Sequence, residues 1–489
     1  MVKKEMHLDQ ELVGTRSLIQ SFQGFNSKVL VLSIGLLLSC FIQRNGIAQE
    51  LNYEVQQGAQ LYTQFCASCH GAKVQAFTEK VEWQHGTSSS QIYASISEGY
   101  VDLGMPQWGS ALTEPQINSL VAYLEYGFEV ASKYEFKKTN PNTVFTSTDF
   151  EFKLELVTNQ VESAWGMDWL PEGDLLVTDK IGDMMRISSD GVKYEIENVP
   201  KVNDAGQGGL LDVELHPNYK ENGWLYLSYS AQKKGKTTTA VSRYKLVDDE
   251  LIDEQLIFEG LPYSGTHHHY GCRLEFDQSG YLFVTIGDRG ARDENPQDLS
   301  VFPGKVHRLN DDGTIPNDNP FVQEPNAIPS IFSYGHRNPQ GMAIHPTTGA
   351  VWTHEHGPRG GDELNVVQSG KNYGWPVISY GINYDGSVFT GLTAKEGMQQ
   401  PFHYWVPSIA PCGMTFVTSD RYPGWQGHLL IGSLKFENVN LCKMGKDEVV
   451  SEEILMKGVG RVRNIKEGPD GFLYVALEEP GAIYKIVPQ

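Results

Sequence analysis

GCRLEFDQSGYLFVTIGDRG, residues 271–290, contains two apolar stretches separated by the polar turn Asp-Gln-Ser-Gly. Apolar stretches on either side of a short turn rich in Asp and Gly predict a β-hairpin. Variants of this phrase, with Pro, Asp or Gly at the turn, recur at residues 166–187, 209–230, 341–358, 413–434 and 462–486. Six copies at irregular spacing predict an all-β six-bladed β-propeller, because a solenoid would repeat more regularly and a sandwich would not repeat one hairpin.

A second motif lies far upstream of these repeats. QFCASCHGA (64–72) contains Cys-x-x-Cys-His, the attachment signature of a c-type haem, in which Cys66 and Cys69 bond the porphyrin and His70 ligates the iron. Met105, beside Gly and Pro, is the predicted second axial ligand of the iron. The alternatives are a chance zinc or redox pair for the cysteines and an ordinary core methionine for Met105.

The sequence around the haem motif has helical character. Apolar residues recur at helical spacing in residues 113–128, which begin with Thr and Pro as a helix start does. We therefore expect a small all-α cytochrome c domain. The predicted boundaries are a signal peptide at 1–48, the cytochrome c domain at 49–132, a polar linker at 133–150 and the propeller at 151–489.

The N-terminus predicts an export signal. Lys28 precedes an apolar run from Val29 to Ile42, and small residues offer a cleavage site after Ala48. Lipidation at Cys40 is the alternative. The apolar run is too short for a comfortable membrane span and no other run of that length follows. The mature protein is thus predicted to be periplasmic or secreted, without a membrane span.

Three cysteines remain outside the signal and the haem motif, namely Cys272, Cys412 and Cys442. In an oxidising compartment this odd number allows one disulfide and one thiol. Three buried thiols are an equally good interpretation, and the sequence does not decide between the two.

The charge of the chain limits its partners. Lys and Arg number 39 and Asp and Glu number 60, so the formal net charge is 39 − 60 = −21. Such a balance argues against a nucleic-acid partner. It suits recruitment of hard cations through oxygen ligands, and the Gly-Pro turn HGPRGGDELN (356–365), with Asp362 and Glu363, is a candidate calcium loop.

Histidines and a carboxylate flank the repeat at 271–290. Residues 267–269 are three consecutive histidines, and Asp288 closes the repeat. One histidine acting as a general base that Asp288 orients is the preferred interpretation. A shared zinc site is disfavoured because adjacent residues on a strand point to opposite faces. A structural histidine bonded to backbone remains the alternative.

Cations gather where the last two repeats meet. Lys435 follows the fifth repeat, and Arg461 and Arg463 open the sixth. Three cations converging in an acidic protein predict an anionic ligand, and arginine forks suit carboxylates or a quinone oxygen. Salt bridges to neighbouring carboxylates are the alternative interpretation.

Five segments together resemble one family, the pyrroloquinoline-quinone-dependent aldose sugar dehydrogenases, which are relatives of soluble quinoprotein glucose dehydrogenase. The segments are SYGHRNPQGMAIHP (333–346), EHGPRGGDELN (355–365), KNYGWP (371–376), GSLK (432–435) and RVRNI with GPDGFLYV (461–475). The resemblance extends over nearly all of residues 150–489, which form a six-bladed propeller in that family. It does not cover the haem domain.

The resemblance implies a role for each matching residue. His269 would be the general base, Asp288 the carboxylate that orients it, and Gln207 a residue near the substrate. The residues implied in contacts with the quinone are Arg337, Asn338, Ser408, Lys435, Arg461 and Arg463. Two calcium sites are implied, one on the cofactor from the carbonyls of Gly357 and Pro358, and a structural one at Asp362, Glu363 and Tyr373.

The implied activity is oxidation of an aldose at C1 to a lactone with pyrroloquinoline quinone (PQQ) and calcium. The fused haem c would receive the electrons and pass them to a downstream cytochrome, copper protein or quinone. Cys272 stands where the family pattern has Gly, and the loops that shape sugar specificity differ, which leaves the sugar open.

Two rival functions remain. A calcium-dependent propeller hydrolase or lactonase would not need the three cations. A non-catalytic binding propeller with a haem sensor would not need a base, its carboxylate and the cations together.

Overall fold

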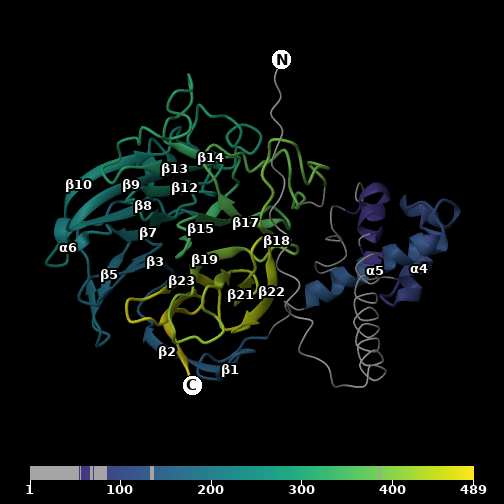
Figure 1. Cartoon of the computed structure of the whole chain (residues 1–489), viewed down its shortest axis with the longest axis horizontal. Coiled ribbons are helices and arrows are strands. Elements are labelled where there is room, and N and C mark those ends of the chain that lie inside the picture. Colours follow the sequence, from purple (N-terminus) through teal and green to yellow (C-terminus); the bar gives the residue numbers. More distant parts are fainter. Residues whose placement is uncertain (1–53, 56, 67–69, 71–84, 133–136, 385–386) are drawn as a thin grey trace, which may run out of the picture. The chain divides into compact units, whose positions relative to one another are not determined.

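The computed structural model describes residues 54–55, 57–66, 70, 85–384 and 387–489 except 133–136, without the side chains of 128–132. The predicted signal peptide, Cys40 and Cys69 lie outside the described residues. The described residues form helices near the N-terminus and, from residue 144 onward, six β-sheets (Figure 1).

The helical part matches the predicted all-α domain. Beyond a helix that includes residues 57–65, it contains α4 (Ser89–Glu98), η2 (Val101–Leu103), η3 (Trp108–Ser110) and α5 (Glu114–Ser132). Ser88 caps α4 in a reciprocal capping box with Gln91, which satisfies donors at the helix start. No helix within the described residues is both long and apolar enough to cross a membrane.

The first helix and α5 approach each other very closely at Gly58. A Cβ added there would lie 1.9 Å from the carbonyl oxygen of Ser119 in α5. Only glycine allows two helix backbones to come this near, so Gly58 fixes the packing of these helices. The apolar face of α5 contributes Ile117, Leu120 and Val121 to the interior.

Five of the six sheets consist of four consecutive antiparallel strands. The first two are β3 (Ala164–Trp169), β4 (Leu175–Asp179), β5 (Met184–Ile187), β6 (Lys193–Glu195), and β7 (Leu210–Leu215), β8 (Trp224–Lys233), β9 (Lys236–Val247), β10 (Glu250–Glu259). The third is β11 (Leu274–Phe276), β12 (Leu282–Ile286), β13 (Lys305–Leu309), β14 (Ile331–Tyr334). The fourth and fifth are β15 (Pro339–Ile344), β16 (Val351–Glu355), β17 (Asp362–Val367), β18 (His403–Trp405), and β19 (Pro411–Phe416), β20 (Leu429–Ser433), β21 (Asn438–Met444), β22 (Val449–Leu455).

The sixth sheet closes the ring by joining the two ends of the propeller sequence. Its strand order is β1-β2-β25-β24-β23, so that β1 (Val144–Thr146) and β2 (Glu151–Thr158) complete a sheet begun by β23 (Val462–Glu467), β24 (Leu473–Glu478) and β25 (Gly481–Pro488). The first strands of the six sheets contact one another in cyclic order, from β3 through β7, β11, β15 and β19 to β23 and back to β3. The six predicted hairpins are the inner strands of these blades, and the six-bladed propeller is confirmed (Figure 1).

The predicted linker at 133–150 is too long, because β1 lies inside it. Phe145 of β1 is buried in the same cluster as Phe152 of β2, and their rings stack with centroids 5.5 Å apart. Because polar residues flank this short strand on both sides, the sequence shows no apolar pattern that would predict it. The propeller therefore begins before residue 151.

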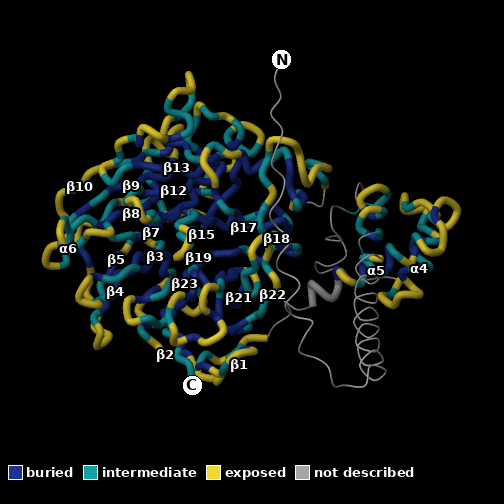
Figure 2. The backbone as a smooth tube through the Cα atoms, viewed as in Figure 1, coloured by how far each residue is buried: buried dark blue, intermediate teal, exposed yellow. Residues whose placement is uncertain are grey.

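Burial is greatest in the inner strands and falls toward the outer edges of the blades (Figure 2). Strands β4, β12, β16 and β20 are buried along their whole length, whereas β10 is mostly exposed and buries only Leu251 and Phe258. Apolar side chains pack between adjacent blades and seal the ring. Cys272, Cys412 and Cys442 are all buried and form no disulfide among the described residues.

A bulge recurs near the start of five of the six innermost strands. The register shifts between Ala164 and Gly166 in β3, and equivalent shifts occur in β7, β15, β19 and β23. A bulge inserts an extra residue and redirects a side chain, and bulges are frequent beside active sites. The residues redirected in β3, β15 and β23 are Trp165, Gln340 and Arg463.

Candidate active site

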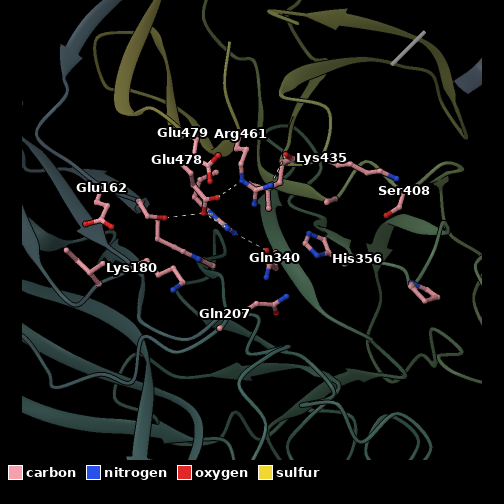
Figure 3. Close-up of a pocket in the computed structure, with 18 of the residues that line it drawn as sticks. Glu162, Lys180, Gln207, Gln340, His356, Ser408, Lys435, Arg461, Glu478 and Glu479 are labelled. Carbon is pink, nitrogen blue, oxygen red and sulfur yellow. Dashed lines mark hydrogen bonds and ion pairs between the residues drawn. The ribbon is translucent and has the colours of Figure 1, made fainter. Parts of the chain in front are cut away.

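A large cavity, about 1080 Å³ in volume, is lined by loops and strand starts of several blades. Trp165, Gln340 and Arg463, the three bulge residues, all line it. Of the residues predicted from the sequence, those that line it are Gln207, Pro358, Ser408, Lys435, Arg461 and Arg463. Residues that are more than 250 positions apart in the chain therefore share one chamber (Figure 3).

One wall of the cavity is cationic. Figure 3 shows Arg461 and Lys435 close together on this wall, with Glu478 beside Arg461. The charged lining residues are five cations, Lys180, Arg359, Lys435, Arg461 and Arg463, and three carboxylates, Glu162, Glu478 and Glu479. The formal charge of the lining is 5 − 3 = +2, in a chain whose net charge is −21. The cavity thus favours an anionic occupant.

Glu478 pairs with both arginines, so the salt-bridge interpretation is correct in part. Its Oε2 accepts from Nε of Arg461 at 3.0 Å and its Oε1 from Nε of Arg463 at 2.6 Å. Burial works to raise the pKa of Glu478, but the two guanidinium groups outweigh it and hold the pKa below its usual range. Arg463 also donates to Oε1 of Gln340 and contacts the Cys412 sulfur. The side chain of Arg463 is only 10% exposed, whereas that of Arg461 is 34% exposed and Lys435 is exposed.

His269 and Asp288 form the pair predicted from the sequence. Nδ1–H of His269 donates to Oδ1 of Asp288 at 2.6 Å, which fixes the tautomer and leaves Nε2 as an acceptor. Asp288 also accepts from the backbone N–H of Gly290 at 2.7 Å and from the indole N–H of Trp375 at 2.9 Å. Asp288 is buried, and burial works to raise its pKa, but His269, Arg337 and the backbone N–H of Gly290 outweigh burial and lower the pKa.

His269 is kept neutral at physiological pH. Burial, followed by the nearby positive charge of Arg337, lowers the pKa of His269 to about 4, against the opposing pull of Asp288. A neutral imidazole with one nitrogen held by a carboxylate has its other nitrogen available as a base. The backbone of His269 has a positive φ of 56°, and its N–H donates to Oε1 of Gln207 at 2.8 Å. Gln207 thereby joins the base to the wall of the cavity.

Arg337 and Asn338 continue this cluster from the loop before β15. Nη1 of Arg337 donates to the carbonyl oxygen of His356, a cavity-lining residue, at 3.0 Å. Oδ1 of Asn338 accepts from the N–H of Gly271 at 3.2 Å. Nε of Arg337 and Nδ2 of Asn338 are buried and have no hydrogen-bond partner in the described structure. Two orphaned donors beside the base indicate a place where a polar ligand would satisfy them.

A buried arginine supports the loop that carries the base. Arg289 is fully buried and donates through Nη2 to Oγ1 of Thr237 and to the carbonyl oxygen of Thr266, both at 2.9 Å, and through Nη1 to the carbonyl oxygen of His268. Its guanidinium lies 3.5 Å from the ring centroid of Tyr270. These contacts hold the segment that leads to His269 from both sides.

Replacing Arg289 by lysine is expected to loosen this loop, because an ammonium group cannot donate in the planar fork that reaches all three acceptors. We expect the free energy of unfolding to fall by about 1–3 kcal/mol, the cost of leaving buried acceptors unpaired. Chemical denaturation measures the change. The exposed Arg421, which donates to the Asp470 carbonyl, provides the matched control Arg421→Lys. Equal stability of the two variants would contradict the role given to Arg289.

The Gly-Pro turn after β16 borders the cavity through Pro358. Pro358 lines the cavity, and a Cβ added to Gly357 would lie 2.3 Å from the carbonyl oxygens of both Gly360 and Gly361. The turn is thus tightly curled around glycine backbone. Backbone oxygens are the donors that a hard cation prefers, so the donor chemistry of this turn suits calcium.

Asp362 does not have the contacts of the calcium ligand that was predicted. Its Oδ1 accepts from the N–H of Gly357 at 2.7 Å and from Oγ of Ser408 at 2.6 Å, and its Oδ2 from the N–H of Ala410 at 2.8 Å. Burial raises the pKa of this carboxyl. Asp362 instead pins the turn to the segment before β19, and Ser408 donates to Asp362 while lining the cavity.

The side chains of Asp362, Glu363 and Tyr373 do not converge. Oε2 of Glu363 accepts from Nδ2 of Asn365 at 3.3 Å, on the opposite face of β17 from Asp362. The hydroxyl of Tyr373 donates to the Val366 carbonyl at 2.5 Å. Among the described residues no three His, Cys, Asp or Glu side chains are grouped as a metal site. A second calcium at Asp362, Glu363 and Tyr373 stays a prediction.

The haem motif is partly described. The N–H of Cys66 donates to the Tyr62 carbonyl at 2.8 Å and the N–H of His70 to the Cys66 carbonyl at 2.9 Å. Each of these bonds joins residues four positions apart, and attachment of the haem at Cys66 with His70 as iron ligand stays a prediction. Met105 pairs with Tyr100 in an isolated bridge after η2 and is partly buried. Its role as axial ligand stays a prediction.

Several site residues were missed by sequence reasoning. Trp375 lies in the quoted segment KNYGWP, and Glu478 lies within the predicted repeat at 462–486, but neither residue has a role in the sequence-based prediction. His356 and Gln340 line the cavity through the turn after β16 and the bulge of β15. The glycine that follows each of Trp165 and Gln340 was the one available signal, because the bulge places the residue before it.

Comparison with known proteins agrees with this architecture. Residues 161–485 match the family described as Glucose / Sorbosone dehydrogenase, and residues 54–124 match Cytochrome C oxidase, cbb3-type, subunit III. The chain is 41% identical over 345 residues to aldose sugar dehydrogenase YliI of Escherichia coli (strain K12), covering 69% of this chain and 93% of that protein. It is 27% identical over 423 residues to quinoprotein glucose dehydrogenase B of Acinetobacter calcoaceticus, covering 68% of this chain and 87% of the relative.

A solved structure shows the same fold. The soluble aldose sugar dehydrogenase of Escherichia coli in its apo form has a TM-score of 0.67 and 40% identity, covering 69% of this chain and 100% of that chain. Sequence and fold both match these relatives over the propeller, and the N-terminal helices match the cytochrome family instead. The chain is therefore an oxidoreductase of the glucose/sorbosone dehydrogenase family, with a cytochrome c domain fused before its propeller.

Proposed function

We propose that the protein oxidises aldose sugars at C1 to lactones with PQQ and calcium, and passes the electrons to its own haem c. The observation that carries this proposal is the hydrogen-bonded pair of neutral His269 and Asp288 next to a cavity with a cationic wall. A base and an anion-binding wall are what an enzyme needs to deprotonate a sugar hydroxyl beside an anionic quinone.

The residues present fit a polyanionic quinone. The cavity lining has a charge of +2, and Nε of Arg337 and Nδ2 of Asn338 are buried donors without a partner in the described structure. Lys435 and Arg461 would hold the carboxylates of the quinone, while Arg337 and Asn338 would donate to its reactive edge. When bound, the quinone supplies the two-electron acceptor that no amino-acid side chain provides.

The residues present also fit one calcium ion on the cofactor. The turn at Gly357 and Pro358 is tightly curled and borders the cavity through Pro358, and Asp362 anchors it by accepting from the N–H of Gly357. Calcium would supply a positive charge that polarises the acceptor. The turn, held by Asp362 and Ser408, would be rigid enough to keep its carbonyls in place.

The protein's own contribution to the reaction is a proton acceptor and a fixed positive charge. Nε2 of His269 would take the proton of the C1 hydroxyl, because Nδ1–H is held by Asp288 and the ring is neutral. The negative charge of Asp288 stabilises the imidazolium that forms. Arg337, fixed by the His356 carbonyl, would stabilise negative charge that develops on the acceptor. Gln207 holds the backbone of His269 and would limit where the sugar sits.

The fused haem would accept the electrons that sugar oxidation releases. Oxidation of the sugar releases two electrons, and a haem accepts them one at a time. Because both domains belong to one chain, their encounter is intramolecular. The downstream acceptor would be a cytochrome, a copper protein or a quinone, and the site of action periplasmic or extracellular, where c-type haems are attached in bacteria.

Visible spectroscopy of the oxidised protein, supplied with PQQ and calcium and titrated anaerobically with an aldose, tests the proposal. We expect the reduced haem bands to grow only when sugar, PQQ and calcium are all present. A Cys66→Ala/Cys69→Ala variant, which cannot attach haem, should still reduce the quinone.

This experiment tests the sugar dehydrogenase activity and the electron transfer to haem separately. Reduced quinone with oxidised haem would retain the dehydrogenase and contradict the internal electron transfer. No change with any sugar of a broad panel would contradict the substrate class.

A further inference from the structure

The side chain of Trp375 contacts both the Asp288 carboxylate and the Arg337 guanidinium, the two charged groups beside His269. Its indole N–H donates to Oδ2 of Asp288 at 2.9 Å, while Oδ1 of the same carboxylate accepts from His269. Its ring lies 5.3 Å from the guanidinium carbon of Arg337. One side chain therefore contacts both charged groups that control the base.

Trp375 is itself rigidly held. The side chain is buried and packs edge-on against Phe389, with ring centroids 5.3 Å apart. Its backbone N–H donates to the Gly335 carbonyl at 2.9 Å, and its own carbonyl accepts from Nε2 of Gln297 at 2.7 Å. A partner fixed on all sides transmits its position to the groups that it touches.

The contacts of Asp288 explain why a fixed position of Trp375 is important for the orientation of His269. With Gly290 and His269 on Oδ1, the Trp375 indole is the donor on Oδ2 among the described residues. Without it, the carboxylate could rotate about its Cβ–Cγ bond, and the Nδ1–H of His269 would lose its fixed direction. The ring face under Arg337 likewise restricts a guanidinium whose Nε is unpartnered in the described structure.

We propose that Trp375 is a positioning residue that fixes the Asp288 carboxylate through its indole N–H and the Arg337 guanidinium through its ring. This inference rests on the proposed function, because it concerns the residue assigned as the base. Trp375 takes no proton and touches no substrate. It sets the orientation and the basicity of His269 through two neighbours.

Trp375→Phe separates the hydrogen bond from the ring, because phenylalanine keeps an aromatic face under Arg337 and lacks the donor. We expect kcat to fall about tenfold, the effect of one lost hydrogen bond to a charged group, with little change in KM. Trp375→Leu, which also removes the ring, should lower kcat further and weaken binding of PQQ.

The pH profile provides a readout that mere structural damage would not produce. His269 is faced by Asp288, Arg337, His268 and His356. A carboxylate that loses a donor attracts the imidazolium more strongly, so the acidic limb of kcat/KM should move to higher pH by about one unit. The same shift should be measurable in the cofactor-free protein by NMR titration of ¹⁵N-labelled histidines, with His269 assigned through His269→Gln.

Trp425→Phe is the matched control. Trp425 is fully buried in the blade core, like Trp375, but its indole nitrogen has no hydrogen-bond partner among the described residues. Its replacement by phenylalanine therefore removes packing without removing a bond and should leave the titration of His269 unchanged. A Trp375→Phe variant that behaves as Trp425→Phe does, in kcat and in the His269 titration, would overturn the proposal.

A measurement on the wild-type protein covers the case in which Trp375→Phe does not fold. The indole N–H of Trp375, identified in ¹⁵N-tryptophan spectra by replacing the other tryptophans one at a time, should shift with the titration of His269. An indole signal that does not respond to that titration would overturn the proposal. Because this response needs no sugar and no quinone, it tests the positioning role even if the proposed activity fails.

Discussion

Replacing His269 by glutamine is expected to lower kcat by about 10²–10⁴-fold, the contribution typical of a positioned general base. Glutamine offers an amide N–H that can still donate to Asp288, so the loop and the carboxylate should keep their places. The amide nitrogen has no basic lone pair and cannot take the sugar proton. Steady-state kinetics with the PQQ- and calcium-loaded enzyme measures the loss, and quenching of tryptophan fluorescence should show unchanged binding of PQQ.

His267→Gln is the control within the same triplet. His267 is exposed, and its part in the site is a backbone carbonyl that accepts from the N–H of Gln207 at 2.8 Å. Its side chain should be replaceable without loss of activity. Near-normal turnover of His269→Gln, or an equal loss in His267→Gln, would contradict the assignment of the base.

The pH dependence of kcat/KM follows from the same geometry. Burial and Arg337 lower the pKa of His269 to about 4, so the neutral, active form dominates above that pH. At pH 5 about nine-tenths of such a residue is neutral, whereas an ordinary histidine would be almost wholly protonated. Activity should therefore persist as the pH falls from 7 to 5 and decline near 4. A decline centred near 6.5 would mean that the base is not desolvated as the structure has it.

The repeated hairpins made the propeller predictable, because the inner two strands of each blade are buried and keep an apolar pattern. The outer strands carried a weaker signal. Strand β10 is mostly exposed, and β1 has three residues, of which Phe145 alone is buried. A short strand with one apolar residue has no period to detect. For this reason the linker predicted at 133–150 is too long, and the predicted sixth blade is too short.

The pairing of His269 with Asp288 was also predictable, since both lie at the ends of one hairpin and their spacing is local. The contacts that hold this pair in place were not predictable from the sequence. Trp375 is 87 residues from Asp288 in sequence and reaches it only because the fourth blade places its loop beside the third. The pairing of Glu478 with both arginines likewise depends on adjacent strands β23 and β24. Contacts of this kind follow from closure of the ring and leave no trace in spacing.

Asp362 shows that one residue type can serve two purposes. An acidic residue in a Gly-Pro turn has the composition of a calcium ligand, and the family resemblance implies the same role. In the structure its carboxylate accepts from the N–H of Gly357 in the turn, and from the hydroxyl of Ser408 and the N–H of Ala410 in the segment before β19. A carboxylate that stabilises a turn and one that binds a cation need similar residues nearby, so sequence alone does not separate them.

The second large effect is expected in the affinity for PQQ. The double variant Lys435→Met/Arg461→Met removes two of five cations from the cavity lining and changes its formal charge from +2 to 0. Each charge-assisted hydrogen bond contributes about 1.5–3 kcal/mol, so losing two should weaken binding by about 10²–10⁴-fold. Methionine keeps the length and apolar character of each stem. Arg463 is left in place because Glu478, Gln340 and Cys412 already engage it, and its removal would strand a buried carboxylate.

Titration of the calcium-loaded protein with PQQ, followed by tryptophan fluorescence, measures this loss. Arg421→Met is the control, since Arg421 lies over Phe472 and donates to the Asp470 carbonyl without lining the cavity. Added salt should weaken PQQ binding to the wild type more than to the double variant, because screening acts on the charges that the variant lacks. Equal affinity and equal salt dependence would mean that the cationic wall serves to bind Glu478 and Glu479, and that the quinone is held elsewhere or not at all.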